Sequence, residues 1–386
     1  MTTPLRSVAA PTEEDLAHLV AMSSLDGLGP SRLSAVLEGR SPAEAWEVLR
    51  TASTRPGDPL GCCRGVNPGR LVRWAEEARR IDPVALLARH RELGVDVMTA
   101  TDPDWPPALL GDPEPPMLLF GRGPVRIGAD PVRPSVAVVG TRRCTSYGRS
   151  LAGELGEALA RAGVTVVSGL ASGIDATAQR AALDAGGRVV GVVGSGLDRV
   201  YPSSSRTLWR DLSERGRLFS ECPLGLSPAP WRFPARNRIV AALADVVVVV
   251  ESAERGGSLH TVDAAVERDR PVMAVPGPIR SPASRGTNRL IADGCAPVCD
   301  VGDVLTAVGM LSEGSAGSPR PSRVDPGSGL AGAPALVLDA LGWESQTLSG
   351  LCLATGLEPA GVTTALFHLE ARGTVHCQGG WWQRVR

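Results

Sequence analysis

The sequence contains no lysine, and all 40 of its basic residues are arginine. Walker A phosphate loops, protein kinase cores and Schiff-base enzymes each depend on a lysine at a defined position. The absence of lysine therefore argues against these three classes. With 41 acidic residues, the formal net charge is −1. Any contact with nucleic acid must then come from a local cluster of arginines and not from the charge of the whole protein.

Long apolar runs and paired metal-ligating motifs are also missing. No run approaches the ~18 to 20 apolar residues of a membrane span, and the N-terminus has no apolar signal-peptide core. Eight cysteines in 386 residues lack both the density of a disulfide framework and the paired spacing of a zinc site. We expect a soluble cytoplasmic protein that binds no metal or cofactor and does not contact a membrane, with its cysteines as free thiols.

Changes of pattern divide the chain into four segments. Residues 1–100 read as a helical domain of the helix-hairpin-helix or SAM-like type, 311–333 as a flexible linker rich in Ser, Gly and Pro, and 334–386 as a winged-helix domain. Residues 101–310 alternate apolar strands with helices, as in DVVVVVES at 245–252. Near-continuous apolar strands predict a mostly parallel sheet covered on both faces, which is a Rossmann-like doubly wound α/β domain.

A glycine-containing turn, LDGLGP at 25–30, interrupts the first helices. Such turns in helix-hairpin-helix motifs bring backbone amides close to a DNA phosphate. A purely structural turn between two helices fits the sequence equally well, so both interpretations stay open.

Glycines and small polar residues follow most of the predicted strands. The carboxyl ends of parallel strands share one edge of the sheet, where ligands bind. Glycine lets backbone amides approach a ligand, helix N-termini attract anions and arginine suits phosphate. Short strand-to-helix turns also need glycine for structural reasons, but several of them at one edge favour a phosphate site. The candidate residues at this edge are Gly140, Arg142, Ser168, Gly169, Gly173, Asp175, Arg236, Asn237, Arg238, Gly257 and Ser258.

The phosphate can belong to a free nucleotide or to a nucleic-acid strand. The segment GTRRCTSYG at 140–148 lacks the G-x-G-x-x-G pattern of a dinucleotide site. Trp231 and Phe233 precede the arginines, and aromatic rings interleaved with basic residues are typical of a single-strand groove. The two rings could instead fill the core. No catalytic motif is present, and we expect Asp175 to cap its helix and fix the glycine turn. The sequence thus predicts a binding protein with no catalytic residue.

A series of stretches in fixed order resembles the DNA-processing protein A (DprA/Smf) family. They include VAVVGTR at 136–142, TVVSGLASGIDATAQRAAL at 165–183, GSGLDRVYP at 194–202 and FPARNRIVAALADVVVVVES at 233–252. The resemblance implies a Rossmann-fold homodimer that binds and protects single-stranded DNA. It also implies that the protein loads the RecA recombinase in natural transformation. By motif, DNA contacts carry over onto Arg142, Ser168, Gly169, Gly173 to Asp175, Phe233, Arg236 to Arg238, Gly257 and Ser258.

Two questions stay open at this point. The family often has histidine at Gln179, serine at Thr141 and Gly256, and asparagine at Ser205, which leaves the role of Gln179 undefined. The alternative function is a nucleotide-binding enzyme or sensor of the phosphoribohydrolase-like Rossmann type. Its catalytic carboxylate would be Asp175 or Glu251, although Glu251 could instead pair with an arginine.

Overall fold

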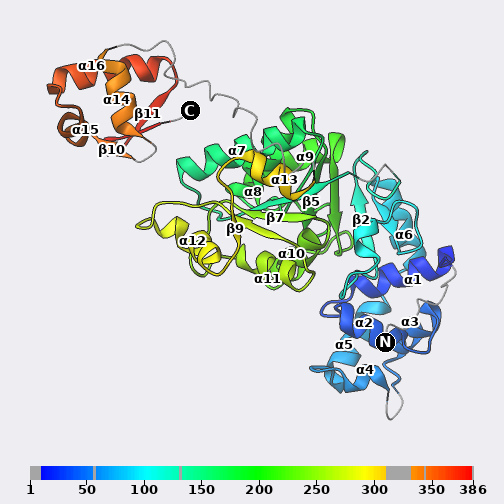
Figure 1. The fold of residues 1–386 in the computed structure, drawn as a ribbon. Helices are drawn as coiled ribbons and strands as arrows, with labels where there is room; N and C mark the ends of the chain where they lie inside the picture. The colour runs from blue at the N-terminus through cyan, green and yellow to red at the C-terminus, as the bar shows by residue number, and fades with distance from the viewer. Residues whose placement is uncertain (1–9, 55–57, 130–132, 310–331, 343–344, 385–386) are drawn as a thin grey trace.

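The computed structural model describes residues 10–54, 58–129, 133–309, 332–342 and 345–384. Three parts follow one another along the chain: N-terminal helices, a central α/β sheet and a small C-terminal domain (Figure 1).

The N-terminal part is helical, as predicted. Most of its helices begin at a proline that follows a side chain capable of capping, such as Ser41, Asn67 or Asp82. Proline is well suited to the first helical position, where its missing N–H costs nothing. The helices are α1 (Glu13–Ser24), α2 (Pro30–Leu37), α3 (Pro42–Thr51), α4 (Pro59–Cys62), α5 (Pro68–Ala78) and α6 (Pro83–Glu92). The glycine-containing turn at 25–30 joins α1 to α2 and is anchored by Trp74, whose Nε1 donates to the Asp26 carbonyl at 2.8 Å.

The central sheet is mostly parallel, with strand order β1-β2-β6-β5-β4-β3-β7-β8-β9. Strands β3 to β9 all run parallel to one another, and the order reverses at β3, which lies between β4 and β7. Their bounds are β3 (Ser135–Val139), β4 (Thr165–Ser168), β5 (Val189–Val193), β6 (Arg217–Ser220), β7 (Val246–Val249), β8 (Val272–Ala274) and β9 (Ala296–Pro297). Every strand predicted from an apolar run is present.

Helices cover both faces of this sheet, which confirms the mixed α/β fold. Alternate residues of one strand enter different cores: Val136 and Val138 pack toward α7 and α8, whereas Ala137 and Val139 pack toward α10 and α11. This period of two is the geometry of a strand buried on both sides. The helices are α7 (Ser146–Arg161), α8 (Ile174–Asp184), α9 (Arg206–Arg215), α10 (Arg232–Ala242), α11 (Leu259–Val266), α12 (Arg285–Ala292) and α13 (Val301–Ala307).

One edge of the sheet was not predicted. Strands β1 (Asp96–Met98) and β2 (Leu119–Arg122) add to β6 in antiparallel register. They are too short to show a recognisable period, and Asp96 is held in place by the buried Arg217 at 2.7 Å. Because β1 belongs to the sheet, the α/β part begins a few residues before the predicted boundary at 100.

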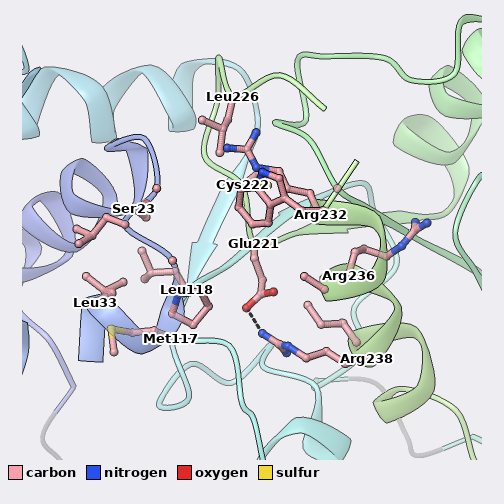
Figure 2. A pocket seen from close by; sticks show the side chains of 18 of the residues that line it. Ser23, Leu33, Met117, Leu118, Glu221, Cys222, Leu226, Arg232, Arg236 and Arg238 are labelled. Carbon is pink, nitrogen blue, oxygen red and sulfur yellow. Dashed lines mark hydrogen bonds and ion pairs between the residues drawn. The ribbon is translucent and has the colours of Figure 1, made fainter. Parts of the chain in front are cut away.

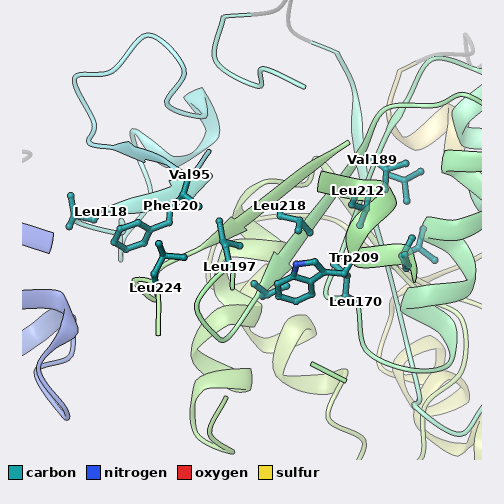
Figure 3. Close-up of a cluster of buried hydrophobic side chains, with 14 of the residues drawn as sticks. Val95, Leu118, Phe120, Leu170, Val189, Leu197, Trp209, Leu212, Leu218 and Leu224 are labelled. Atoms are coloured by element: carbon teal, nitrogen blue, oxygen red, sulfur yellow. The ribbon is translucent and has the colours of Figure 1, made fainter. Parts of the chain in front are cut away.

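This edge joins the sheet to the N-terminal helices. The buried cluster in Figure 3 runs from Trp209 of α9 and Leu218 of β6 to Phe120 of β2. His90 of α6 stacks on Phe120 with ring centroids 5.1 Å apart, and its Nε2 accepts the amide of Leu224 at 3.0 Å. The N-terminal helices therefore share a hydrophobic core with one of the two faces of the sheet.

The C-terminal domain contains three helices and a hairpin. Helices α14 (Ala333–Leu341), α15 (Leu348–Thr355) and α16 (Pro359–Ala371) pack with β10 (Gln346–Thr347), β11 (Val375–Gln378) and β12 (Trp381–Arg384). The apolar face of α16, which includes Val362, Leu366 and Leu369, is buried. Its assignment as a winged helix stays a prediction. The predicted linker at 311–333 lies almost wholly outside the described residues.

In the described parts of the chain, no single helix has both the length and the apolar character of a membrane span. The bent pair α15 and α16, which meet at 109°, passes that test of length and composition only when taken together.

Candidate nucleic-acid interface

An arginine and two aromatic rings stack at the carboxyl edge of the sheet. Arg142 follows β3 and is exposed, and its guanidinium carbon lies 5.3 Å from the ring centre of Phe233. Tyr201, from the loop after β5, also stacks on Phe233, with 5.3 Å between the two ring centres. Tyr201 is 41% exposed. Three strand exits thus supply one cationic and aromatic surface.

Helix α10 extends this surface to the exit of β7. Phe233 and Asn237 are four residues apart, so they lie on one face of the helix. The Asn237 side-chain amide lies 3.5 Å from the carbonyl oxygen of Gly257. Within the described residues, nothing accepts a hydrogen bond from the backbone amides of Gly257 and Ser258, and a side chain at Gly257 would meet open space. We call the surface formed by Arg142, Tyr201, Phe233, Asn237 and Gly257 the rim.

Arg236 and Asp175 lie beneath the rim rather than on it. Arg236 is 7% exposed and donates to the carbonyl oxygens of Gly169 and Val192. Burial lowers the pKa of Arg236 to about 10, against the opposing effect of the nearby Asp175. Burial likewise raises the pKa of the Asp175 carboxyl, again opposed by Arg236. At neutral pH, Arg236 remains charged and serves to hold the ends of β4 and β5 together.

Asp175 does not cap its helix, contrary to the prediction. It is the second residue of α8, whose N-cap is Gly173. Its carboxylate accepts the amide of Gly169 at 3.1 Å, so it fixes the glycine turn as expected. This carboxylate already occupies the amide that a phosphate would otherwise contact.

Three of the candidate glycines are required by packing. A side chain at Gly140 would meet Ile174 and the Glu251 backbone, and one at Gly169 would meet the Arg236 guanidinium at 2.5 Å. Gly173 has φ +88° and would place a Cβ 2.3 Å from the Thr141 carbonyl oxygen. These glycines let strand ends and helices pack closely. This is the structural need for glycine in short strand-to-helix turns that the sequence also allowed.

The candidate hydroxyls and the last arginine also have internal partners. Ser168 donates to the Val138 carbonyl at 2.6 Å, and Ser258 donates to Ser252 at 2.9 Å. Arg238 lies on a different face of α10 from Phe233 and donates to Glu221. Trp231, at the N-terminus of α10, is 57% exposed, so it is not a core residue.

Both carboxylates that a nucleotide hydrolase would need are engaged by the protein. Asp175 is fully buried at the glycine turn. Glu251 is 2% exposed and accepts both the amide and the hydroxyl of Thr145, the N-cap of α7. The partner of Glu251 is therefore a helix N-terminus and not an arginine. No group of three or more metal-ligating side chains occurs among the described residues.

Gln179 and Ser205, two of the positions that depart from the family pattern, support one unusual backbone residue. Leu170 follows β4 with φ +53°, a conformation that costs energy in a residue with a Cβ. The Gln179 side chain accepts the Leu170 amide at 3.1 Å and donates to the Val190 carbonyl at 2.9 Å. The Ser205 hydroxyl donates to the Leu170 carbonyl at 3.1 Å. Both residues shape the exit of β4.

The fold and the site together define a doubly wound α/β protein whose strand exits carry an exposed arginine, aromatic rings and unpaired amides. Residues 96–309 match the family described as DNA recombination-mediator protein A. The chain belongs to this family, which confirms the DprA/Smf resemblance.

Relatives match over most of the chain. DprA of Mycobacterium tuberculosis is 36% identical over 370 residues, which cover 92% of this chain and 91% of the relative. The crystal structure of DprA from Streptococcus pneumoniae superposes with a TM-score of 0.62 at 32% identity, covering 77% of this chain and 98% of that one. DprA from Helicobacter pylori, described for its single-stranded DNA binding mode, gives a TM-score of 0.51 at 27% identity, covering 56% and 96%.

Proposed function

We propose that the protein binds single-stranded DNA along the rim. The observation that supports this most strongly is the stack of Arg142, Phe233 and Tyr201 beside the unpaired amides of Gly257 and Ser258. Arginine and helix N-terminal amides bind phosphates, and exposed rings stack on bases. A single strand offers both groups side by side, whereas a duplex conceals the faces of its bases.

Contacts of this type are tolerant of sequence and sensitive to salt. Each phosphate neutralised by a cation steepens the dependence of log K on log salt concentration by about 0.7 for a single strand. Each stacked base contributes about 1–3 kcal/mol. Arg236 and Asp175 act as positioning residues, because they fix the strand exits from below.

The test is fluorescence anisotropy with a labelled oligothymidine and with a duplex of equal length, each over a series of salt concentrations. We expect tight single-strand binding with a steep salt slope and weak duplex binding. Equal affinity for both forms, or a slope near zero, would contradict the proposal.

We further propose that the protein acts as a homodimer that delivers the strand to the RecA recombinase. Membership of a recombination-mediator family supports this step. RecA ATP hydrolysis on DNA coated with single-strand-binding protein provides the assay. We expect the protein to shorten the lag before hydrolysis, and an unchanged lag would refute the delivery step. Sedimentation analysis of the free protein measures whether it is a dimer.

The C-terminal domain is proposed to be a winged helix that binds another protein or duplex DNA. Phe367 of α16 and Trp381 of β12 are exposed, at 61% and 51%, whereas Trp382 packs against the core of the domain. Arg372 is the C-cap residue of α16. Removal of residues 332–386 should leave single-strand affinity intact.

A further inference from the structure

A cavity lies on the face of α10 opposite the rim. It opens between the N-terminal helices and the exits of β5 and β6, and it encloses about 130 Å³. A water-sized group needs about 10–15 Å³ of such a cavity, so the cavity holds roughly ten of them. This number is close to that of the non-hydrogen atoms in a nucleobase.

The walls of this cavity are largely apolar. Leu28 and Leu33 come from the turn between α1 and α2 and from α2, Met117 and Leu118 precede β2, and Ile239 belongs to α10. Figure 2 shows Leu33, Met117 and Leu118 on one side and the polar residues of the sheet and α10 facing them. The glycine-containing turn at 25–30 thus forms part of a pocket.

The charged groups that line the cavity are Glu221 and three arginines, Arg232, Arg236 and Arg238. Arg232 and Arg236 donate to backbone carbonyls, whereas Arg238 pairs with Glu221. Arg238 Nη2 donates to Glu221 Oε1, and their side chains are 11% and 20% exposed. The described residues provide no partner for the other nitrogen, the buried Nη1 of Arg238, and no hydrogen bond reaches Glu221 Oε2. Burial raises the pKa of the Glu221 carboxyl and the ion pair with Arg238 opposes it. The ion pair therefore places an unused acceptor, Glu221 Oε2, next to an unused donor that lies beneath the cavity wall.

These features select the chemistry of the ligand. Apolar walls disfavour a phosphate, and each arginine of the lining already donates to a carbonyl or to the Glu221 carboxylate. A purely apolar group would leave the Glu221 acceptor unsatisfied. A flat aromatic group with a donor on one edge satisfies both the apolar walls and the Glu221 acceptor. Every nucleobase has such an edge.

The cavity is connected to the rim through α10. Ala235 and Arg238 line the cavity, and Phe233 and Asn237 of the same helix face the rim. Trp231, which is exposed, lies at the N-terminus of α10 and also lines the cavity. A strand whose phosphates follow the rim can therefore turn one base over Trp231.

We propose that this cavity binds a single nucleobase, with the Glu221–Arg238 pair reading its edge. For a base of a bound strand, the inference rests on the proposed single-strand function. A free nucleoside carries the same chemistry and is the other source.

The test places 2-aminopurine at each position in turn of an oligothymidine and records its fluorescence on binding. We expect the fluorescence to change at one position within the stretch of oligonucleotide that each protein molecule covers. Ala235→Phe fills the cavity, so it should abolish that change and weaken oligonucleotide binding by about five- to tenfold, the lower range for one stacked base. Ala88→Phe, at an exposed position of α6, is the matched control and should change neither. Glu221→Gln keeps the shape of the cavity and should reduce the change, with thermal melting as a check on folding.

Titration with free 2-aminopurine riboside distinguishes the two sources. A signal that competes with the oligonucleotide signal and is lost in Ala235→Phe would assign the cavity to free nucleosides as well. If anisotropy reports binding but neither probe responds, the cavity proposal is wrong while the rim proposal stands. If no oligonucleotide binds, the proposed function fails, and the riboside alone decides the role of the cavity.

Discussion

Replacement of Arg142 by alanine is expected to weaken single-strand binding without unfolding the protein. Arg142 is exposed, and among the described residues no carboxylate lies within ion-pair distance of it. Among the described residues, the interaction recorded for its guanidinium is a cation–π contact with the Phe233 ring, at 5.3 Å. An exposed cation–π contact stabilises a protein by about 0.5–1 kcal/mol. The melting temperature should therefore change little.

The effect on binding should be much larger. A hydrogen bond to a charged group contributes about 1.5–3 kcal/mol, so Kd should rise roughly 10- to 150-fold. The logarithmic salt slope should become shallower by about 0.7 with the loss of one phosphate contact. Arg142→Lys should retain the salt slope and recover only part of the affinity, because lysine lacks the planar fork.

The matched control is Arg161→Ala. Arg161 is 72% exposed and is paired with Glu157. It is the last residue of α7, whose first residue, Ser146, lies near the strand exits. Its removal changes the net charge by the same amount. Anisotropy on both variants at matched salt separates a local contact from the general field. Equal losses in the two variants, or no loss in Arg142→Ala, would refute the reasoning.

Three further changes test other parts of the structure. Phe233→Leu should weaken oligonucleotide binding by about 1–3 kcal/mol per base while leaving the salt slope unchanged; a changed slope would contradict a stacking role. Burial lowers the pKa of His90, and its neutral ring accepts the Leu224 amide. The stabilisation that this neutral ring provides is present above the unfolded pKa of about 6.5 and is lost as the pH falls below that value. The difference in melting temperature between wild type and His90→Gln should shrink from pH 7.5 to 5.5. Arg268 and Asp112 form an ion pair with side chains only 3% and 2% exposed, so Arg268→Met should destabilise the fold by about 3–5 kcal/mol in chemical denaturation, and a cost near zero would show that the pair is not needed.

The strands of the sheet could be predicted because each is a short apolar run that both faces bury. The convergence of Arg142, Phe233 and Gly257 followed from the rule that parallel strands share a carboxyl edge. The antiparallel edge of the sheet could not be predicted, because β1 and β2 are only three and four residues long. Their position depends on pairing with β6, which is distant in sequence.

The arginine cluster at 236–238 shows a limit of reading a site from sequence. Consecutive residues of a helix point in directions about 100° apart. Once α10 begins at Arg232, Arg236, Asn237 and Arg238 cannot all face one surface: the first is buried, the second reaches Gly257 and the third enters the cavity. Tyr201 was missed because it lies in a loop with no periodic pattern. It is one of 2 tyrosines, and it lies just after a strand exit inside GSGLDRVYP at 194–202, one of the stretches that carry the family resemblance.

Photocrosslinking tests the position of the strand most directly. An oligothymidine containing 5-iododeoxyuridine is irradiated in complex with the full-length protein, and the crosslinked peptides are identified by mass spectrometry. We expect crosslinks to the rings of Phe233 and Tyr201, and their loss in Arg142→Ala at a concentration that saturates the wild type. Crosslinks confined to the N-terminal helices or to the C-terminal domain would contradict the central claim that the rim holds the strand.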